Sequence, residues 1–570
     1  MDRKNITWDL SDLGKLENID KEVSEIRKLA DKIEKYRKNF NENISSKEFL
    51  KILNETEKLM VRLSKNASLI HLNFYKDTKN PKFHSLTSKI DTLGAEISNK
   101  LMFISLEFKK FSEKNAERLI KETPSHSYYL KRLRELKDYT LAEEVEKVIN
   151  LKDVSGINAL ISIYYIFVSE FKYEFEGKKI TQEELLKHVK DTNPKRRERA
   201  YESLLGKYRE NKNIISLIYS NVVNNWMTEI QLRGYKSPIS IRNEANDLED
   251  EDVDTLLRVF EKNIDIFREY FNAKAKALGV KKLRRYDIYS PMSKIKKEFD
   301  FNKGRNLVID SFSGFDDFKK IAEDILKNHV DSEVKEGKRG GAFCHCPNPK
   351  TKPFVMMSYT GDLKSVETLA HELGHGIHFS LSSKNNIYSH DAVLPMAETA
   401  STFCETLWLS HMKKKFRDIR RDLIFTELDG AYASIARQFN FVIFEKKAHE
   451  LIKNGGSSED IEELYLDLLK RHFGDSIELN DIFRYEYLYI PHIFETPFYC
   501  YAYGFGLLLA LSLYRKYLDD NSFKKDIVKI FKSGSNDSPR NILKKSGIEM
   551  NGEFWQNGFD YLRSLVKDLK

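Results

Sequence analysis

The chain has 570 residues, of which 41% are apolar, and this suffices for several ordinary domains or one large enzyme with subdomains. Its net charge of +8 is small beside 95 basic and 87 acidic side chains. No basic block carries the interleaved aromatic residues of a nucleic-acid-binding surface, so we expect no nucleic-acid partner.

The chain also lacks the sequence features of exported and membrane proteins. The N-terminal residues contain no long apolar core of a signal peptide. The longest apolar stretches, near 159–168 and 505–513, are too short and too interrupted to cross a bilayer. Four cysteines do not indicate a disulfide framework. Cys344 and Cys346 flank His345, and we expect both thiols to be free on a loop. The sequence thus predicts a soluble, cytoplasmic protein that does not bind membranes.

Helical patterns dominate the first half of the chain. Apolar residues recur at steps of three and four over residues 15–36, 46–75 and 81–116, which predicts a helical hairpin or bundle. Residues 117–185 are also mostly helical, with a turn and strand pattern at 173–180. Scaffold is the simplest role for these charged helices.

Helical patterns continue from 195 to about 280, and a glycine-rich stretch and a strand come later. Gly340 and Gly341 are not followed by the Lys-Ser/Thr of a phosphate-binding loop. They are better explained by close approach of the backbone to another strand or to a ligand. Residues 353–359, which end at Tyr359, have strand composition. We expect this strand to be one of very few, and to pair edge to edge with an extended peptide.

The motif His371-Glu372-Leu-Gly-His375 carries the clearest chemistry. Its helix is supported by apolar residues at three- and four-residue steps and by a turn at Gly361-Asp362. Residues four apart lie on the same helix face, so His371 and His375 can bind one Zn²⁺. Glu372 points about 100° further round, where its carboxylate reaches a water and acts as general base. A five-residue motif with only three specified residues also occurs by chance in unrelated proteins. The flanking sequence is therefore needed to support the metal site.

Catalytic zinc needs a third protein ligand. His378 lies on the same face, but about 10.5 Å along the helix from His371, so one ion cannot bridge them. Glu398 is the better candidate, in a helix that Pro395 can start, and His390 is its main rival. Three residues share the helix face of Glu398 and could orient the ligands: Ser401, Thr402 and Glu405. Either Glu367 or Glu405 could hold a ligand imidazole by its second nitrogen.

A third cluster contains His492 and several tyrosines. Tyr499 and Tyr503 are four residues apart, so a helix would present both phenols on one face, with Tyr501 pointing elsewhere. Such donors can stabilise the oxyanion formed in peptide hydrolysis. Core packing is the alternative explanation of a tyrosine-rich stripe.

These three clusters, in their order and spacing, resemble the thimet oligopeptidase and oligoendopeptidase F family, and bacterial oligoendopeptidase F most closely. The resemblance implies a mostly α-helical protein in two parts around a deep substrate channel, with a small β-sheet beside the zinc helix. It implies one zinc ion held by His371, His375 and Glu398, with Glu372 as base and His492, Tyr499 and Tyr503 at the substrate carbonyl. Tyr501, Gly340, Gly341 and Tyr359 are expected to contact substrate.

The domains implied are a helical bundle at 1–110, an N-terminal lobe at 111–190 and a catalytic domain at 191–570. We expect a zinc endopeptidase that cleaves short, unstructured oligopeptides at internal bonds. The rivals are a zinc carboxypeptidase, which needs a fixed cation for the terminal carboxylate, and an inactive helical peptide-binding protein.

Overall fold

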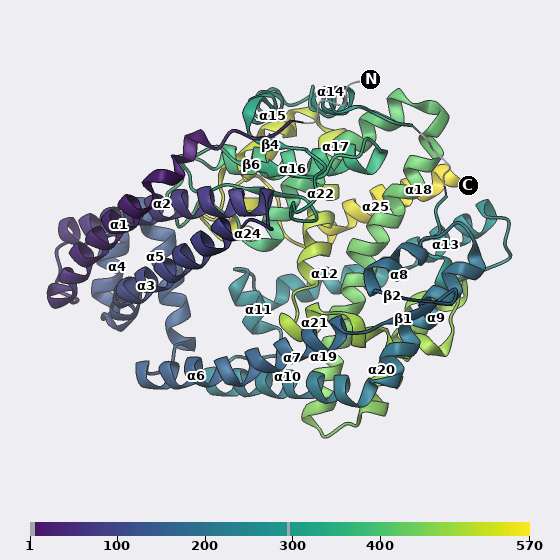
Figure 1. Ribbon diagram of the computed structural model, residues 1–570, viewed down its shortest axis with the longest axis horizontal. Coiled ribbons are helices and arrows are strands. Elements are labelled where there is room, and N and C mark those ends of the chain that lie inside the picture. The colour runs from purple at the N-terminus through teal and green to yellow at the C-terminus, as the bar shows by residue number, and fades with distance from the viewer. Residues whose placement is uncertain (1–5, 293–296) are drawn as a thin grey trace. The chain divides into compact units, whose positions relative to one another are not determined.

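The computed structural model describes residues 6–292 and 297–570, so the first five residues of the N-terminal stretch lie outside it. The described chain is mostly helical with small sheets, as predicted (Figure 1). It divides into two compact units. Unit 1 comprises residues 1–138, 296–412 and 517–548, and unit 2 comprises 139–295, 413–516 and 549–570. The predicted domain boundaries at 110 and 190 concern the order of domains along the chain and stay a prediction.

Unit 1 contains the N-terminal helices and both helices of the predicted metal site. Its helices are α1 (Ile19–Glu34), α2 (Ser46–Lys76), α3 (Pro81–Lys110), α4 (Glu113–Glu122), α5 (Ser127–Glu135), α14 (Phe301–Ser311), α15 (Asp316–Asn328), α16 (Leu363–Leu381), α17 (Leu394–Lys415), α23 (Lys524–Lys532) and α24 (Pro539–Lys544).

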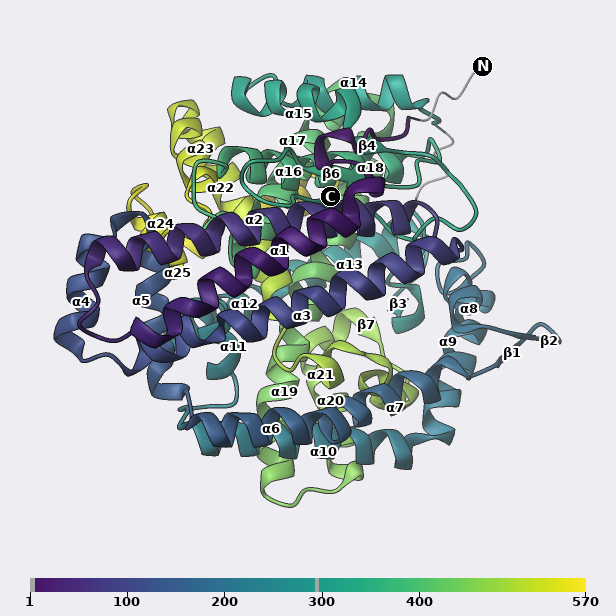
Figure 2. The same ribbon diagram turned by 60° about the vertical axis from the view of Figure 1, so that its left-hand side comes forward.

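Helices α1, α2 and α3 pack against one another as the predicted bundle (Figure 2). Helix α2 begins at its capping residue Ser45, which accepts a hydrogen bond from the Glu48 amide. The third helix, α3, ends at Lys110 and is shorter than the predicted 81–116. There Phe111 takes an extended backbone, and its ring packs on Phe40 with centroids 5.7 Å apart. Burial of this ring therefore outweighs continuation of the helix.

The sheet of unit 1 has three short strands in the order β4-β6-β5. They are β4 (Val330–Asp331), β5 (Phe343–His345) and β6 (Phe354–Met356), with β6 parallel to β4 and antiparallel to β5. Helix α16 packs against β5 and β6, so the predicted strand beside the motif helix is confirmed. The expectation that this strand pairs with a peptide is wrong, because β6 already has a partner on each side. The edge strands of this sheet are β4 and β5. The Ser332 amide, just after β4, donates to the Ile6 carbonyl oxygen, so the N-terminal segment already lies beside the β4 edge.

Unit 2 is built almost entirely from helices. These are α6 (Glu143–Ser155), α7 (Ile157–Ser169), α8 (Gln182–His188), α9 (Pro194–Glu210), α10 (Lys212–Arg233), α11 (Ser240–Ala245), α12 (Asp250–Asn263), α13 (Asp265–Ala277), α18 (Arg420–Ala431), α19 (Arg437–Lys453), α20 (Ser458–Phe473), α21 (His492–Glu495), α22 (Tyr501–Asp519) and α25 (Gly552–Leu569). A π-helical turn, Tyr432–Ala436, joins α18 to α19.

The strands of unit 2 form two small pairs. The predicted turn and strand pattern near 173–180 is the antiparallel hairpin of β1 (Tyr173–Phe175) and β2 (Lys178–Ile180). Strands β3 (Leu283–Arg284) and β7 (Ile477–Glu478) are parallel.

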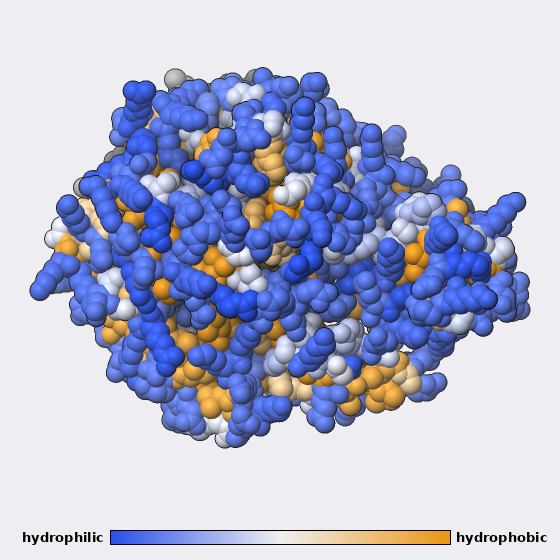
Figure 3. Space-filling model, turned by 180° about the vertical axis from the view of Figure 1, so that it is seen from behind, coloured by the Kyte–Doolittle hydropathy of each residue, from blue (hydrophilic) through white to orange (hydrophobic). Residues whose placement is uncertain are grey.

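Helices α6 and α7 expose an unusual amount of apolar surface. Leu151 and Val154 are 74% and 68% exposed, and Figure 3 shows apolar surface where α6 lies, at the lower right. By length and composition, the stretch Glu143–Ser169 could cross a membrane. The stretch is interrupted at Gly156, and its first half carries acidic and basic residues. One such helix is weak evidence of a membrane-spanning segment. The expectation of no membrane contact stays a prediction.

Candidate metal centre

Helix α16 presents the two motif histidines. Asp362 caps it by accepting a hydrogen bond from the Ser365 amide at 2.7 Å. The apolar stripe is fully buried, with each of Val366, Leu369, Ala370, Leu373 and Ile377 at 0% exposure. This burial fixes the rotation of the helix, so that the face with both histidines keeps part of its surface exposed.

Helix α17 crosses α16 at Gly374. A Cβ at this position would lie 2.6 Å from the Ser401 Cα and 2.8 Å from the Ala400 carbonyl oxygen. The crossing is therefore closer than any residue with a side chain would allow. It brings Glu398, near the start of α17, to the two histidines of α16.

The three candidate ligand groups converge at this crossing. His371 Nε2 lies 3.2 Å from His375 Nε2, and each nitrogen lies 3.7 Å from Glu398 Oε2. Two ligands on a tetrahedral zinc ion at about 2.05 Å are separated by about 3.3 Å. The spacing therefore fits one ion bound by two imidazoles and one carboxylate. Among the described residues, these three form the group of potential metal ligands with this geometry.

Neighbouring polar groups hold the candidate ligands in orientation. Glu405 Oε1 lies 3.1 Å from His371 Nδ1, which directs the other ring nitrogen towards the site. The Ser401 hydroxyl donates to Glu398 Oε2 at 3.1 Å. Burial lowers the pKa of His371, but the hydrogen bond and charge of Glu405, with Glu372 and Glu398, raise it overall to about 9.

Glu372 is buried, and its carboxylate interacts electrostatically with His371 and Glu398 of this group. Its side chain is 5% exposed, and it accepts a hydrogen bond from the Cys344 backbone on β5. Burial, with the charges of Glu398 and Glu405, raises its pKa to about 7, against the charge of His371. A carboxyl group with such a pKa is suited to take up and release a proton near neutral pH.

The other candidate ligands are engaged elsewhere. His390 is buried, with Nε2 3.0 Å from the Phe379 carbonyl oxygen and Nδ1 3.1 Å from Asp391. His378 is buried against Phe531, and burial lowers its pKa to about 4. Glu367 pairs with Lys364 at 2.8 Å. The contact to the His371 imidazole is thus made by Glu405.

The predicted histidine and tyrosine group lies in unit 2. The ring of His492 stacks on that of Tyr499 at 5.8 Å and meets Tyr503 edge-on at 6.0 Å, while the two tyrosine rings are 5.4 Å apart. The Tyr503 hydroxyl is 3.4 Å from His492 Nε2. The expected helix over Tyr499 is wrong, because α22 begins at Tyr501 and Tyr499 lies in the preceding turn. The three rings come together through this turn.

A strained residue and a buried carboxylate shape that turn, and the sequence analysis missed both. Phe498 has φ of +60°, which is rare for a residue with a side chain. Its amide donates to Glu445 Oε1 at 2.8 Å, and Glu445 is 0% exposed. Burial raises the Glu445 pKa to about 8, against the Phe498 hydrogen bond and the charge of Arg242. The available signal was an acidic residue on the buried stripe of α19, four positions after Phe441.

Four further residues were expected to contact substrate. Tyr501 is 0% exposed and its hydroxyl accepts a hydrogen bond from Asn246 at 2.7 Å, so this phenol faces the core. Tyr359 is buried and donates to the Phe299 carbonyl oxygen at 2.9 Å. Both side chains are buried in this structure, and contact of either with substrate stays a prediction.

The glycines were expected to allow close approach of a strand or a ligand. A Cβ at Gly340 or Gly341 would meet nothing within 4 Å, so no strand of the described chain approaches them. Gly341 has φ of +82°, which accounts for glycine at that position. Approach of a ligand stays a prediction.

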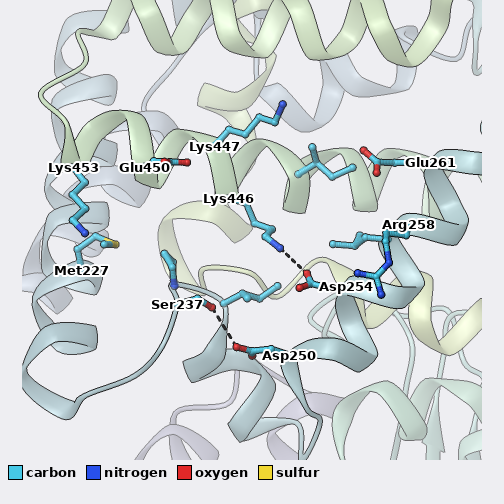
Figure 4. A pocket seen from close by; sticks show the side chains of 14 residues that line it. Met227, Ser237, Asp250, Asp254, Arg258, Glu261, Lys446, Lys447, Glu450 and Lys453 are labelled. Carbon is cyan, nitrogen blue, oxygen red and sulfur yellow. Dashed lines mark hydrogen bonds and ion pairs between the residues drawn. The ribbon is translucent and has the colours of Figure 1, made fainter. Parts of the chain in front are cut away.

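A separate pocket of about 720 Å³ lies in unit 2 between α10, α12 and α19 (Figure 4). Its side chains are of mixed charge and partly paired. Asp254 accepts from Lys446 at 2.7 Å, and Asp250 accepts hydrogen bonds from Ser237 and Ser240. The group of potential metal ligands found among the described residues lies elsewhere, at His371, His375 and Glu398, so this pocket is a poor candidate for a metal-dependent reaction centre.

Comparison with known proteins identifies the class. The model of the family described as peptidase family M3 matches residues 187–558, and a model described as oligopeptidase F matches residues 107–172. An oligoendopeptidase F homolog of Borreliella burgdorferi is 26% identical over 96% of this chain and 94% of its own length. Oligopeptidase PepF of Bacillus subtilis is 23% identical over 95% of this chain and 83% of its own.

Solved structures share the fold. A peptidase from Chlamydophila abortus described as putative superposes with a TM-score of 0.88 at 21% identity, covering 100% of this chain and 99% of that one. The oligoendopeptidase F of Enterococcus faecium gives a TM-score of 0.70 at 18% identity, covering 97% and 98%. The fold and the matched family define a helical metallopeptidase. The chain belongs to peptidase family M3 and is a metalloendopeptidase, a hydrolase of peptide bonds.

Proposed function

We propose that the chain is a zinc-dependent oligoendopeptidase and that His371, His375 and Glu398 hold one zinc ion. The observation that carries the proposal is the mutual spacing of 3.2 to 3.7 Å between their ligand atoms, close to that required by a tetrahedral ion. Zinc bound there supplies a Lewis acid that lowers the pKa of a coordinated water towards about 7.

Glu372 is the proposed general base. It takes the proton of the attacking water and returns it to the leaving amine, which a pKa of about 7 permits in both directions. The bond from the Cys344 backbone keeps its carboxylate turned towards β5. His492 and the phenols of Tyr499 and Tyr503 are proposed to donate hydrogen bonds to the oxyanion. Their mutual contacts support a joint role.

The peptide backbone is proposed to pair with the free side of β5. The amides of Val355 on β6 and of Met357 just after it donate to the carbonyl oxygens of His329 and Asp331. Cys344, opposite Val355, therefore turns its backbone groups away from β6. Its carbonyl oxygen can accept from an extended peptide. Backbone pairing of this kind tolerates many side chains. Gly340 and Gly341, just before β5, leave room for such a strand.

We further propose that the substrates are unstructured oligopeptides of roughly 6–20 residues, cut at internal bonds in a channel that admits one extended strand. Folded proteins enter such a channel only after local unfolding, which costs several kcal/mol. We place the enzyme in the cytoplasm, where such peptides arise from protein turnover.

The test compares a folded protein, the same protein denatured, and its tryptic peptides as substrates of the zinc-loaded enzyme, with products read by mass spectrometry. Peptides should be cut rapidly at internal bonds and the folded protein slowly. Equal rates on folded protein and peptides would exclude the channel. Cleavage confined to the last residue, abolished by C-terminal amidation, would favour a carboxypeptidase. Peptide binding without any cleavage would favour an inactive binding protein.

A further inference from the structure

Two arginines of unit 2 share one buried carboxylate. Arg285 and Glu486 are 2% and 1% exposed, and Arg285 Nη2 lies 2.6 Å from Glu486 Oε1. Arg437, the first residue of α19 after the π-helical turn, approaches the same oxygen with its Nη2 at 3.5 Å. The group therefore has two guanidinium charges and one carboxylate charge, and one positive charge is not balanced within it.

Among the described residues, the groups with the strongest electrostatic effect on the two arginines are Glu486 and several phenols, so no second carboxylate is among them. Five phenols interact with the two arginines, and burial raises the pKa of each above its usual value, so they stay neutral: Tyr201, Tyr289, Tyr432, Tyr465 and Tyr489. Burial also lowers the pKa of His472, and the charge of Arg285 lowers it further. A buried charge without a partner is costly, so an unbalanced guanidinium favours an anionic ligand.

Arg437 is the part of this group that a ligand can reach. Its side chain is 21% exposed, whereas those of Arg285 and Glu486 are each 2% exposed. Within residues 6–292 and 297–570, its Nε is buried without a hydrogen-bond partner. Its Nη2 contacts the Tyr489 hydroxyl at 3.1 Å, and its guanidinium lies over the Phe441 ring at 4.8 Å. The guanidinium is thus held in place, and the exposed part of the side chain offers its positive charge to a carboxylate.

The position of Arg437 links it to the proposed oxyanion group in the same unit. Tyr489, which Arg437 contacts, precedes His492 by three residues in the segment that leads into α21. After burial, the charge of Arg437 is the main influence that lowers the pKa of His492. A peptide held at His492 would therefore come within reach of this guanidinium.

We propose that Arg437 binds a carboxylate of the peptide substrate and so makes the enzyme favour peptides that carry one at a fixed distance from the cleaved bond. This inference rests on the proposed peptidase function. The carboxylate comes either from an Asp or Glu side chain or from the C-terminus of a short peptide. Cleavage stays at internal bonds in both cases, and the two sources give different results in the test.

The test uses matched fluorogenic peptides with one cleavable bond. In one arm a Glu is moved along the peptide and compared with Gln, and in the other the C-terminal acid is compared with its amide. Wild-type kcat/KM should favour the carboxylate by at least about 10-fold in one arm, as expected for charge-assisted hydrogen bonds. R437Q should reduce that ratio to about 1, with the uncharged peptide changed by less than about 3-fold, and R437K should retain part of it.

Arg233 offers a matched control. Its side chain is 20% exposed and it also lies in unit 2, but it faces two carboxylates, Glu146 and Glu229, and so carries no spare charge. R233Q should leave the carboxylate ratio unchanged. A ratio that R437Q leaves intact, or the absence of any preference in wild type, would overturn the proposal. An equal loss on charged and uncharged peptides would also do so, since it would indicate a structural role.

Binding separates this proposal from the proposed chemistry. In an E372Q background, fluorescence anisotropy should show the same preference for the carboxylate peptide, and the added R437Q change should remove it. Wild-type protein that binds the peptides but cleaves none would contradict the peptidase function, and the anisotropy ratio would still decide the role of Arg437.

Discussion

The candidate ligand group of unit 1 and the histidine–tyrosine group of unit 2 are held in different ways. His371, His375 and Glu398 sit within two regular helices that cross at a glycine, and no residue of either helix has a positive φ. His492 and Tyr499 sit on a short helix and a turn, and that turn contains a strained residue tied to a buried carboxylate. A metal site needs fixed separations, which helices supply. An oxyanion site needs donors aimed at one point, and here a turn supplies them.

The largest effect that distinguishes the two groups is expected from E372Q. The glutamine keeps the size of the side chain but cannot take the water proton, so kcat should fall by roughly 10²–10⁴ with zinc retained. Activity and zinc content, measured on the same sample, check this. Loss of zinc would show that Glu372 is itself a ligand.

The unit 2 group should affect turnover without affecting metal. H492A and Y499F are each expected to lower kcat by roughly 10²–10³ at unchanged zinc content, because one donor to the oxyanion is lost. Y501F is the control, since its phenol is buried on Asn246, and it should change stability more than kcat. If H492A or Y499F altered KM alone, the group would bind the ground state instead.

The helix crossing predicts a smaller effect on the metal. Gly to Ala inside a helix usually stabilises by about 1 kcal/mol. In G374A the new methyl group would meet Ser401 at 2.6 Å and push α17, with Glu398, away from α16. We expect zinc affinity about 10–100-fold lower, measured by competition with a chelator. G430A is the control, because nothing lies within 4 Å of a Cβ there. Equal affinities of the two variants would contradict the account.

The smallest effect concerns Glu445 and pH. Its pKa is about 8 in the folded chain, above the 4.5 of an unperturbed carboxyl, so the folded state binds the proton more tightly. Stability should therefore fall as pH rises from about 4.5 to 8, by a few kcal/mol at most. E445Q keeps an acceptor for the Phe498 amide and should flatten this part of the stability curve. Denaturant unfolding at several pH values checks this, and an unchanged slope would contradict the assigned pKa.

Much of the unit 1 site could be predicted because its signals are local. The spacing of His371 and His375, the cap at Asp362 and the helix start near Pro395 depend on neighbours in sequence. The crossing at Gly374 could not be predicted, since periodicity does not tell which helix lies opposite. The central position of β6 was missed for the same reason.

The sequence predicted which residues make up the histidine–tyrosine group of unit 2, but it did not predict the backbone conformation that brings them together. The spacing of Tyr499 and Tyr503 indicated a helix, and the strained backbone at Phe498 ends that pattern. The amide of Phe498 is bonded to Glu445, 53 residues earlier in the chain. A turn stabilised by so distant a partner leaves no trace in the local sequence.

The most direct test of the central claim is the zinc content of E398A and H390A after dialysis, measured by mass spectrometry of the metal. The account predicts that wild type and H390A retain one zinc ion per chain, whereas E398A loses it. Circular dichroism should show that both variants are folded. Zinc retained by E398A and lost by H390A would contradict the assignment of the metal to His371, His375 and Glu398.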